Sequence, residues 1–371
     1  MSRAPRVLLL CERLDIAGGV ERFVCALAGH LAGQGLAVAV GSVGTPREQL
    51  RYPLAPAVRV LHRGLPLPAG DGAWPLLRRQ WRVGRALARL IREESPDAVL
   101  LNGLTTACSV LLFAPPADAA RCIACDHNHF GARSRPWQRL RAWLYRDLAA
   151  VVSLTRADAP RFAALNPGTE VIVNASSLRA DAPARPAGET VLAVARHVAQ
   201  KGLDLMLQAW VAVAAARPAA RLLIVGDGPL QGALQRQAQA LGIAGSVQWR
   251  PPTPDIEPLY RAAAVFVLPS RYEGMPLALL EAQALGVPAV AFDCPTGPAE
   301  IVTPETGLVV PAGDVPALAQ ALAALLADPG RRARMGAAAI ERSRTHFSPE
   351  LHYARWTALV QRVAAQRALP G

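Results

Sequence analysis

The sequence predicts an α/β fold of two domains, each a parallel sheet covered by helices. Short, nearly continuous apolar runs recur along the chain and alternate with segments whose apolar residues have helical spacing. Such runs are typical of strands buried on both faces of a parallel sheet. The chain of 371 residues is also too long for one comfortable hydrophobic core. We therefore expect each half to build its own sheet.

The predicted elements follow in order along both halves. Helical spacing is clear in 20–33, in 229–242 and in 348–366, where a Ser-Pro pair marks the helix start. The strands predicted in the first half are 6–11, 36–43, 97–101, 121–125, 150–154 and 170–174. Those predicted in the second half are 190–195, 221–226, 264–269 and 288–292.

A run of proline, glycine and small residues, RADAPARPAGE (179–189), is the best candidate linker. We expect a Rossmann-like domain over 1–180, a second over 185–345, and a helix over 346–371 that crosses back to the first domain. Ligands of open parallel sheets lie beyond the carboxyl ends of the strands. The loops that follow strands are therefore the first candidates for function.

Composition narrows the class of protein. Of the residues, 52% are hydrophobic and 18% charged, as in a folded protein with a large core. No apolar run reaches the roughly 20 residues that a bilayer requires, and the start resembles a strand more than a signal peptide. Six scattered cysteines favour reduced thiols. We expect a cytoplasmic protein, which could lie on the inner face of the plasma membrane.

Charge is concentrated in the first half of the chain. The total is +12; residues 1–180 hold 23 basic and 13 acidic side chains, or +10, whereas residues 181–371 hold 17 and 15, or +2. This field favours an anionic partner: nucleic acid, a phosphorylated substrate or an acidic membrane. Nucleic acid is disfavoured, because only 5% of residues are aromatic and no recognised binding module is present.

One lysine stands among 39 arginines. In ARHVAQKG (195–202), Arg196 follows a predicted strand and Lys201 lies five residues later. Lysine and arginine are interchangeable on a surface but not at a shaped site, because the ammonium is a compact point charge. Two cations at one strand exit suit a diphosphate. The alternative is two solvated basic residues.

The stretch LPSRYEGMPLALLEAQALG (268–286) is the most specific in the chain. Glu273 lies in a loop after a strand, and Glu281 lies in the helix that follows. Two carboxylates in this arrangement could bind sugar and ribose hydroxyls, and free amides at the helix start could bind phosphate. The alternative is two ordinary surface glutamates. The residues between them that complete the candidate site are Gly274, Met275, Pro276 and Leu277.

Three further motifs are weaker. Gly18 and Gly19 precede a helix, where backbone amides could approach a ligand, but a plain tight turn fits equally well. The glycines of GDGPLQG (226–232) resemble a dinucleotide fingerprint, yet QWRPP (248–252) stands where that fingerprint needs an acid. CIACDHNH (122–129) has zinc-like spacing, but no second cysteine pair follows it, which favours a buried strand entering a loop.

These motifs, in this order, resemble glycosyltransferase family 4. EGMPLALLEA is similar to that family's E-x7-E element, ARHVAQKG to its R-x4-K-G element and GGVER to its N-terminal glycine loop. DHNHF (126–130), SLTRAD (153–158) and GDGP (226–229) also lie where the family has comparable segments. The resemblance covers nearly the whole chain and implies the GT-B fold, in which two Rossmann-like domains face each other across a cleft.

The resemblance also implies the reaction and the roles of the residues. The reaction is transfer of a sugar from a nucleotide-sugar donor with retention of configuration. Arg196 and Lys201 would neutralise the departing diphosphate, Glu273 would contact the donor sugar, and Glu281 the ribose. Gly18 and Gly19 would lie beside the phosphates, and His127 beside the donor sugar. No D-x-D metal motif occurs, so we expect no metal ion and no other cofactor.

Donor and acceptor are less closely defined. DCPTGPAEIV (293–302) resembles members that act on lipid-linked or envelope oligosaccharides with UDP-sugars, so a UDP-hexose or UDP-N-acetylhexosamine is favoured and GDP-mannose comes next. The departures from the family pattern are VNASS (173–177) and QWRPP (248–252), and the second lies near the base-binding region. The alternatives are a sugar-nucleotide epimerase of the same fold or an NAD-dependent oxidoreductase.

The segment GARSRPWQRLRAWLYRDL (131–148) could meet an anionic membrane. It carries five arginines, an apolar stripe of Trp137, Leu140, Leu144 and Leu148, and two more aromatic residues beside that stripe. Basic and aromatic residues on an amphipathic helix suit a lipid surface. A core-packed helix with a solvated basic side explains the pattern equally well.

Overall fold

The computed structural model describes residues 3–16, 18–43, 45–65, 73–184, 186 and 188–366, and for residues 73–76 it describes the backbone only. Contacts divide the chain into two compact units. Unit 1 comprises Met1–Ile172 and Glu350–Gly371, and unit 2 comprises Val173–Pro349. The chain therefore leaves unit 1 after Ile172, earlier than the candidate linker at 179–189, and returns to it after Pro349.

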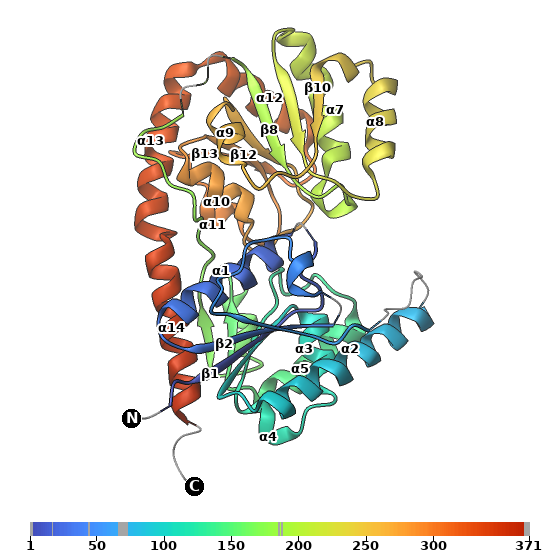
Figure 1. Cartoon of the computed structure of the whole chain (residues 1–371). Helices are drawn as coiled ribbons and strands as arrows, with labels where there is room; N and C mark the ends of the chain where they lie inside the picture. The colour runs from blue at the N-terminus through green and yellow to red at the C-terminus, as the bar shows by residue number, and fades with distance from the viewer. Residues whose placement is uncertain are drawn as a thin grey trace. The chain divides into compact units, whose positions relative to one another are not determined.

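Unit 1 is built on a seven-stranded sheet in which every neighbouring pair is parallel (Figure 1). Its strand order is β3-β2-β1-β4-β5-β6-β7, so the direction of winding reverses between β1 and β4. Ligands of open α/β sheets bind beyond the strand ends at such a reversal. The strands are β1 (Arg6–Leu10), β2 (Ala37–Ser42), β3 (Arg59–His62), β4 (Ala98–Asn102), β5 (Cys122–Cys125), β6 (Ala150–Ser153) and β7 (Thr169–Val171).

Helices pack on the sheet of unit 1, and the last one comes from the C-terminal end of the chain. Leu8 and Leu10 share one sheet face and join a core with Leu87 of α2. Trp356 of α14 is 1% exposed, and its ring lies 5.4 Å from that of Phe23 in α1. The helices are α1 (Gly19–Gly33), η1 (Arg47–Gln49), α2 (Ala73–Glu94), α3 (Leu104–Leu111), α4 (Pro116–Ala119), α5 (Arg135–Leu144), η2 (Tyr145–Asp147), α6 (Ala159–Ala163) and α14 (Pro349–Gln366).

Unit 2 repeats the plan with a six-stranded parallel sheet of order β10-β9-β8-β11-β12-β13. Here the winding reverses between β8 and β11. The strands are β8 (Thr190–Val194), β9 (Arg221–Val225), β10 (Val247–Arg250), β11 (Val265–Leu268), β12 (Ala289–Asp293) and β13 (Gly307–Pro311). The helices are η3 (Ala199–Lys201), α7 (Leu203–Ala216), α8 (Gln231–Ala240), η4 (Ala244–Ser246), α9 (Glu257–Arg261), α10 (Leu277–Ala284), α11 (Pro298–Ile301), α12 (Val315–Ala327) and α13 (Pro329–His346).

The predicted α/β fold with parallel sheets is confirmed, and all ten predicted strands are present. Three strands that the predicted set lacks, β3, β10 and β13, all lie at sheet edges. Edge strands are covered less completely, so their sequences lack the long apolar runs that mark central strands. In the part of the chain that the structure describes, none of the helices has the length and apolar character needed to cross a membrane.

Candidate functional site

Two loops of unit 2 bring the strongest candidate residues together. One loop follows β8 and ends in Lys201, and the other follows β11 and contains Glu273. These are the two strands between which the winding reverses. The Lys201 ammonium donates a hydrogen bond of 2.6 Å to Glu273 Oε1, so residues 72 positions apart form one ion pair. The sequence selected both residues but did not predict their contact.

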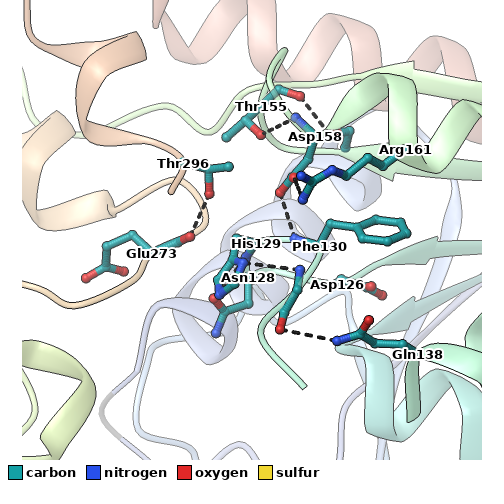
Figure 2. Close-up of polar contacts among 12 residues, drawn as sticks. Asp126, Asn128, His129, Phe130, Gln138, Thr155, Asp158, Arg161, Glu273 and Thr296 are labelled. Carbon is teal, nitrogen blue, oxygen red and sulfur yellow. Dashed lines mark hydrogen bonds and ion pairs between the residues drawn. The ribbon is translucent and has the colours of Figure 1, made fainter. Parts of the chain in front are cut away.

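Glu273 is fixed by three neighbours. Its side chain is buried, and Oε1 also accepts a hydrogen bond of 2.6 Å from Ser270 Oγ. The hydroxyl of Thr296, just beyond β12, donates to the Glu273 carbonyl at 2.7 Å, as Figure 2 shows. Oε2 accepts no hydrogen bond within the described part of the chain. The carboxylate is thus held on one oxygen while the other can accept a hydrogen bond from a ligand hydroxyl.

A glycine permits the close approach of these two loops. Gly202 has a left-handed φ of 62°, and a Cβ there would lie 1.9 Å from the Pro269 carbonyl oxygen. Any other residue would therefore push the loops apart. Gln200 Nε2 also donates to the Tyr272 carbonyl at 3.0 Å, and the Arg271 N–H donates to the Gln200 carbonyl at 2.8 Å.

The remaining candidates of unit 2 lie near the two residues of this ion pair in the sequence. Arg196 is exposed just after β8, and its guanidinium makes no hydrogen bond or ion pair to any described residue. Gly274, Met275 and Pro276 are buried in the loop after Glu273. Pro276 is the N-cap of α10, and the helix begins at Leu277. The first-turn N–H groups of a helix have no acceptor within it and can bind an anion.

Glu281 lies inside the unit. Its side chain is 4% exposed on α10, and the Tyr260 hydroxyl lies 2.9 Å from Glu281 Oε2 and 2.9 Å from the Ala278 carbonyl oxygen. Tyr260 is itself fully buried. This carboxylate is therefore held in place by a tyrosine that sequence reasoning did not single out. Its contact with a ribose stays a prediction.

Unit 1 gathers the other candidates at its own reversal point. Gly18 is the N-cap of α1 and Gly19 its first residue, and Phe23 on the same helix packs edge-on against the His127 ring, 4.7 Å between centroids. Asn102 is the last residue of β4. Its Oδ1 lies 2.9 Å from His127 Nε2, and its Nδ2 donates a hydrogen bond of 3.1 Å to the Leu10 carbonyl. Asn102 was not among the predicted residues, because nothing marks an asparagine at a strand end as functional.

These contacts define the state of His127. Since the Asn102 amide nitrogen faces Leu10, its oxygen faces His127, and Nε2 of the imidazole carries the hydrogen. Burial and the nearby His352 lower the pKa of His127 to about 3. His127 is therefore a neutral hydrogen-bonding group near pH 7. It also has a left-handed φ of 55°, uncommon for a residue with a side chain.

A buried ion pair holds the loop that carries His127. Arg141 of α5 donates to Asp126 Oδ2 at 2.9 Å, and the Tyr145 hydroxyl donates to Oδ1 at 2.5 Å. Burial raises the pKa of Asp126, against the opposing effects of Arg141 and Tyr145. Further along, the Phe130 N–H donates to the Asp158 carboxylate at 2.7 Å, as Figure 2 shows.

The apolar stripe of segment 131–148 packs inward. Trp137, Leu140 and Leu144 lie against the core of unit 1, and Leu148 belongs to that core. Arg141, one of its five arginines, is buried. The core-packed alternative therefore accounts for the stripe. Trp143 is 57% exposed and remains on the outer side of α5.

The cysteines and histidines of 122–129 lie in a buried strand and in the loop that follows it. Cys122 and Cys125 lie in the buried strand β5, and the Cys125 sulfur is 3.9 Å from His127 Nδ1. Among the described residues, no group of three or more His, Cys, Asp or Glu side chains is placed to hold a metal ion. All six cysteines are free and buried.

Comparison with known proteins identifies the family. The model of Glycosyltransferase Family 4 matches residues 17–175, and that of Glycosyl transferases group 1 matches residues 188–328. A GDP-mannose-dependent monoacylated alpha-(1-6)-phosphatidylinositol monomannoside mannosyltransferase of Corynebacterium glutamicum is 31% identical over 310 residues, or 75% of this chain and 80% of that protein. The chain belongs to glycosyltransferase family 4.

Two other matches support narrower conclusions, because one covers only part of the relative and the other has low sequence identity. An exopolysaccharide phosphotransferase of Streptomyces coelicolor is 36% identical over 236 residues, but the match spans 63% of this chain and only 23% of that protein. The solved sucrose-phosphate synthase of Thermosynechococcus elongatus has a TM-score of 0.81 and 20% identity, and the match covers 98% of this chain and 100% of that one. That likeness shows the shared GT-B fold. Family 4 membership makes the protein a transferase rather than an oxidoreductase or an epimerase.

Proposed function

We propose that this family 4 glycosyltransferase moves a hexose from a nucleoside-diphosphate sugar to a lipid-linked or envelope glycan, with retention of anomeric configuration. The observation that carries the proposal is the Lys201–Glu273 ion pair at the reversal point of unit 2. Arg196, five residues before Lys201 in the sequence, is exposed. The site combines a fixed cation, a second cation and a carboxylate with one oxygen available. Those groups match a diphosphate joined to a sugar.

The chemistry assigned to the site is charge stabilisation. When the bond between the anomeric carbon and the phosphate oxygen breaks, its electron pair stays on the phosphate oxygen. The anomeric carbon bonds to the acceptor hydroxyl oxygen, and the proton of that hydroxyl passes to the departing diphosphate. Lys201 has three N–H donors, of which one is used on Glu273. The other two can donate to phosphate oxygens. Cations fixed before the reaction stabilise this charge as it develops.

Glu273 binds the donor sugar in this scheme. Oε1 is occupied by Lys201 and Ser270, so Oε2 accepts a hydrogen bond from a sugar hydroxyl. Glu281 binds the ribose, and Gly18, Gly19 and His127 of unit 1 contact the phosphates and the sugar. His127 acts there as a neutral hydrogen-bonding group, because its lowered pKa of about 3 keeps it uncharged. The acceptor binds unit 1, where the positive charge is concentrated.

Transfer proceeds without a metal ion. In other enzymes a divalent ion bridges phosphate oxygens and neutralises the leaving group, and here Arg196 and Lys201 take that role. The enzyme is first freed of bound metal. Its turnover in excess chelator should then equal its turnover in buffer without chelator. A loss that added Mg²⁺ or Mn²⁺ restores would overturn this part of the proposal.

The donor is GDP-mannose, with a UDP-sugar as the second candidate. The name of the C. glutamicum relative, which is similar over most of the chain, supports GDP-mannose. The resemblance of residues 293–302 to UDP-sugar enzymes supports the second candidate. Calorimetric titration with GDP and with UDP separates the two, followed by turnover with each matching sugar nucleotide. Tighter binding of UDP and turnover of UDP-glucose would overturn the first choice.

Unit 1 also presents a basic surface with exposed apolar side chains, which we assign to an anionic membrane. Helices α2 and α5 both pack on α3, and the three lie side by side in Figure 1. The exposed apolar residues are Leu77 and Trp81 of α2, Trp143 of α5, and Leu112, the C-cap residue of α3. The Arg85 guanidinium lies 4.6 Å above the Trp81 ring. Exposed arginines beside tryptophan suit anionic headgroups above an acyl boundary.

Vesicle co-sedimentation tests this surface. The protein should pellet with phosphatidylglycerol vesicles at low salt, less so with phosphatidylcholine. Replacing Trp81 and Trp143 with alanine should reduce the pelleted fraction. Leu351 is 52% exposed on α14 and serves as the matched control, since Leu351→Ala should bind like the parent protein. Equal binding by the double variant and the parent would remove α2 and α5 from the proposal.

A further inference from the structure

Two neighbouring loops of unit 2 are joined by main-chain hydrogen bonds. The first follows β8 and contains His197, and the second follows β9 and contains the turn Gly226–Gly228. Because β8 and β9 are paired in parallel, the two loops start side by side. The His197 N–H donates to the Asp227 carbonyl at 2.5 Å, and the His197 carbonyl accepts from the Leu230 N–H at 3.0 Å. Both main-chain groups of His197 are thus used to bind the turn.

The two glycines of the turn permit this contact. Each has a φ of 148°, which residues with side chains rarely adopt. A Cβ on Gly228 would lie 2.7 to 2.9 Å from the backbone oxygen, nitrogen and carbonyl carbon of His197. A Cβ on Gly226 would lie 2.0 Å from the Ala195 carbonyl oxygen. Alanine at either position would therefore displace the loop after β8, since the obstructing atoms belong to the backbone.

The His197 side chain fills the space below the turn. It is 1% exposed, and its ring meets Trp249 of β10 edge-on, with centroids 5.6 Å apart and an angle of 80°. Neither ring nitrogen has a hydrogen-bond partner among the described residues. Burial lowers the pKa of His197, while Asp227 acts in the opposite direction. The ring is therefore a neutral, space-filling group that contacts the turn on one side and β10 on the other.

Arg196 depends on this arrangement for its position. It directly precedes His197, it is exposed, and its guanidinium makes no contact with a described residue that would orient it. Its backbone is fixed by the bonds of its neighbour and by its own carbonyl, which accepts from the Val198 N–H at 2.9 Å. A shift of the loop would therefore move Arg196 with it.

We propose that the Gly226–Gly228 turn and His197 position Arg196 for the donor diphosphate, which makes Gly228 and His197 positioning residues. The proposal rests on the role assigned to Arg196 under the proposed function. A displacement of about 1 Å at a charged group is enough to reduce turnover by about a hundredfold. The GDGP motif, which resembles a dinucleotide fingerprint, thereby has a role in transfer through its contact with the loop that carries Arg196.

A double-mutant cycle tests the proposal. Gly228→Ala should lower kcat/KM by about a hundredfold, and Arg196→Ala should lower it by about the same factor or more. The double variant should be no more than about twofold worse than the poorer single variant, since residues acting through one group are not additive. If the turn had a purely structural role, the loss of kcat/KM in the double variant would be the product of the two single losses. That multiplication would overturn the proposal.

Two further variants complete the experiment. Gly232→Ala is the control, because it lies in α8 with only the end of Arg236 nearby, and it should retain parent turnover. If Gly228→Ala does not fold, His197→Ala keeps every backbone bond but opens a space below the turn, and the same cycle with Arg196→Ala applies. Parent-like turnover of Arg196→Ala alone would instead refute the role of Arg196 in the proposed function.

Discussion

At the scale of single residues, Lys201 and Glu273 are both candidates from the sequence, and the structure joins them in one ion pair that the sequence does not predict. Lys201 was conspicuous because every other basic side chain is arginine. Its partner Glu273 is 72 residues away, and the glycine contact between Gly202 and Pro269 that joins the loops has no local signature. Ser270 and Tyr260 each fix a predicted carboxylate, yet a serine and a tyrosine in buried segments look like ordinary core residues.

Removing the lone ammonium should reduce turnover strongly. We expect Lys201→Ala to lower kcat by about a hundred- to a thousandfold, the usual effect of losing one fixed electrostatic donor. Lys201→Arg should also have a low kcat, because a planar guanidinium does not reproduce a compact point charge. Initial rates with saturating donor measure both, and Arg236→Ala, at an exposed position on α8, is the control. Turnover of Lys201→Ala near that of the parent would contradict the assignment.

His127 should make the protein less stable in acid. Its pKa is about 3 in the folded protein and about 6.5 when unfolded, so between these values the unfolded chain binds a proton that the folded one does not. Stability is complete above pH 6.5 and falls as the pH drops towards 3, by at most about 1.4 kcal/mol per pH unit.

Urea unfolding at pH 7, 6 and 5 measures this effect. His127→Gln should give a flatter dependence, because glutamine does not titrate. Burial also lowers the pKa values of His30, His129 and His197. The variant therefore removes only the contribution of His127 to the dependence of unfolding free energy on pH. An unchanged slope in His127→Gln would show that His127 does not titrate in this way.

At the scale of elements, helix α5 shows why pattern alone left two interpretations open. An apolar stripe on a basic helix fits both a protein core and a lipid surface, and the choice depends on what packs against it. Here the core of unit 1 covers Trp137, Leu140 and Leu144. Nothing in the sequence distinguishes Arg141 from the other four arginines of 131–148, although Arg141 is the one that is buried.

Arg141 should be essential to the stability of unit 1. Arg141→Ala leaves the Asp126 carboxylate buried without its charged partner, which should reduce the free energy of unfolding by about 3 to 5 kcal/mol. Arg139 is exposed on the same helix, and Arg139→Ala should stay within about 0.5 kcal/mol of the parent. Chemical denaturation of both variants provides the comparison. Similar losses at the two positions would contradict a special role for the buried pair.

At the scale of the whole molecule, the two-sheet architecture could be predicted because central strands carry a strong, repeated signal. The point where the chain leaves unit 1 could not be predicted. The run 179–189 has the composition of a linker, yet Ala180 is buried and the Arg344 side chain donates to its carbonyl at 2.9 Å. Composition indicates how freely a segment could move, and contacts with other segments decide whether it does.

The returning helix α14 should be needed for unit 1 rather than for unit 2. Trp356→Ala removes a buried ring beside Phe23 and should reduce the free energy of unfolding of unit 1 by about 3 to 5 kcal/mol. Calorimetric scanning should then resolve two transitions, of which only one moves. Leu351→Ala, on an exposed side of α14, is the control. A single transition shifting as a whole would show that the two units unfold together.

The lone lysine also offers a direct way to follow the occupancy of the site. Lys201 carries the only side-chain amine in the chain; its side chain is 19% exposed, and its amine is bonded to Glu273. An acylating reagent selective for amines would therefore leave its side-chain label at one position. Mass spectrometry of the peptide around Lys201 would then report how much enzyme holds a nucleotide, since a bound diphosphate would shield the nitrogen from acylation.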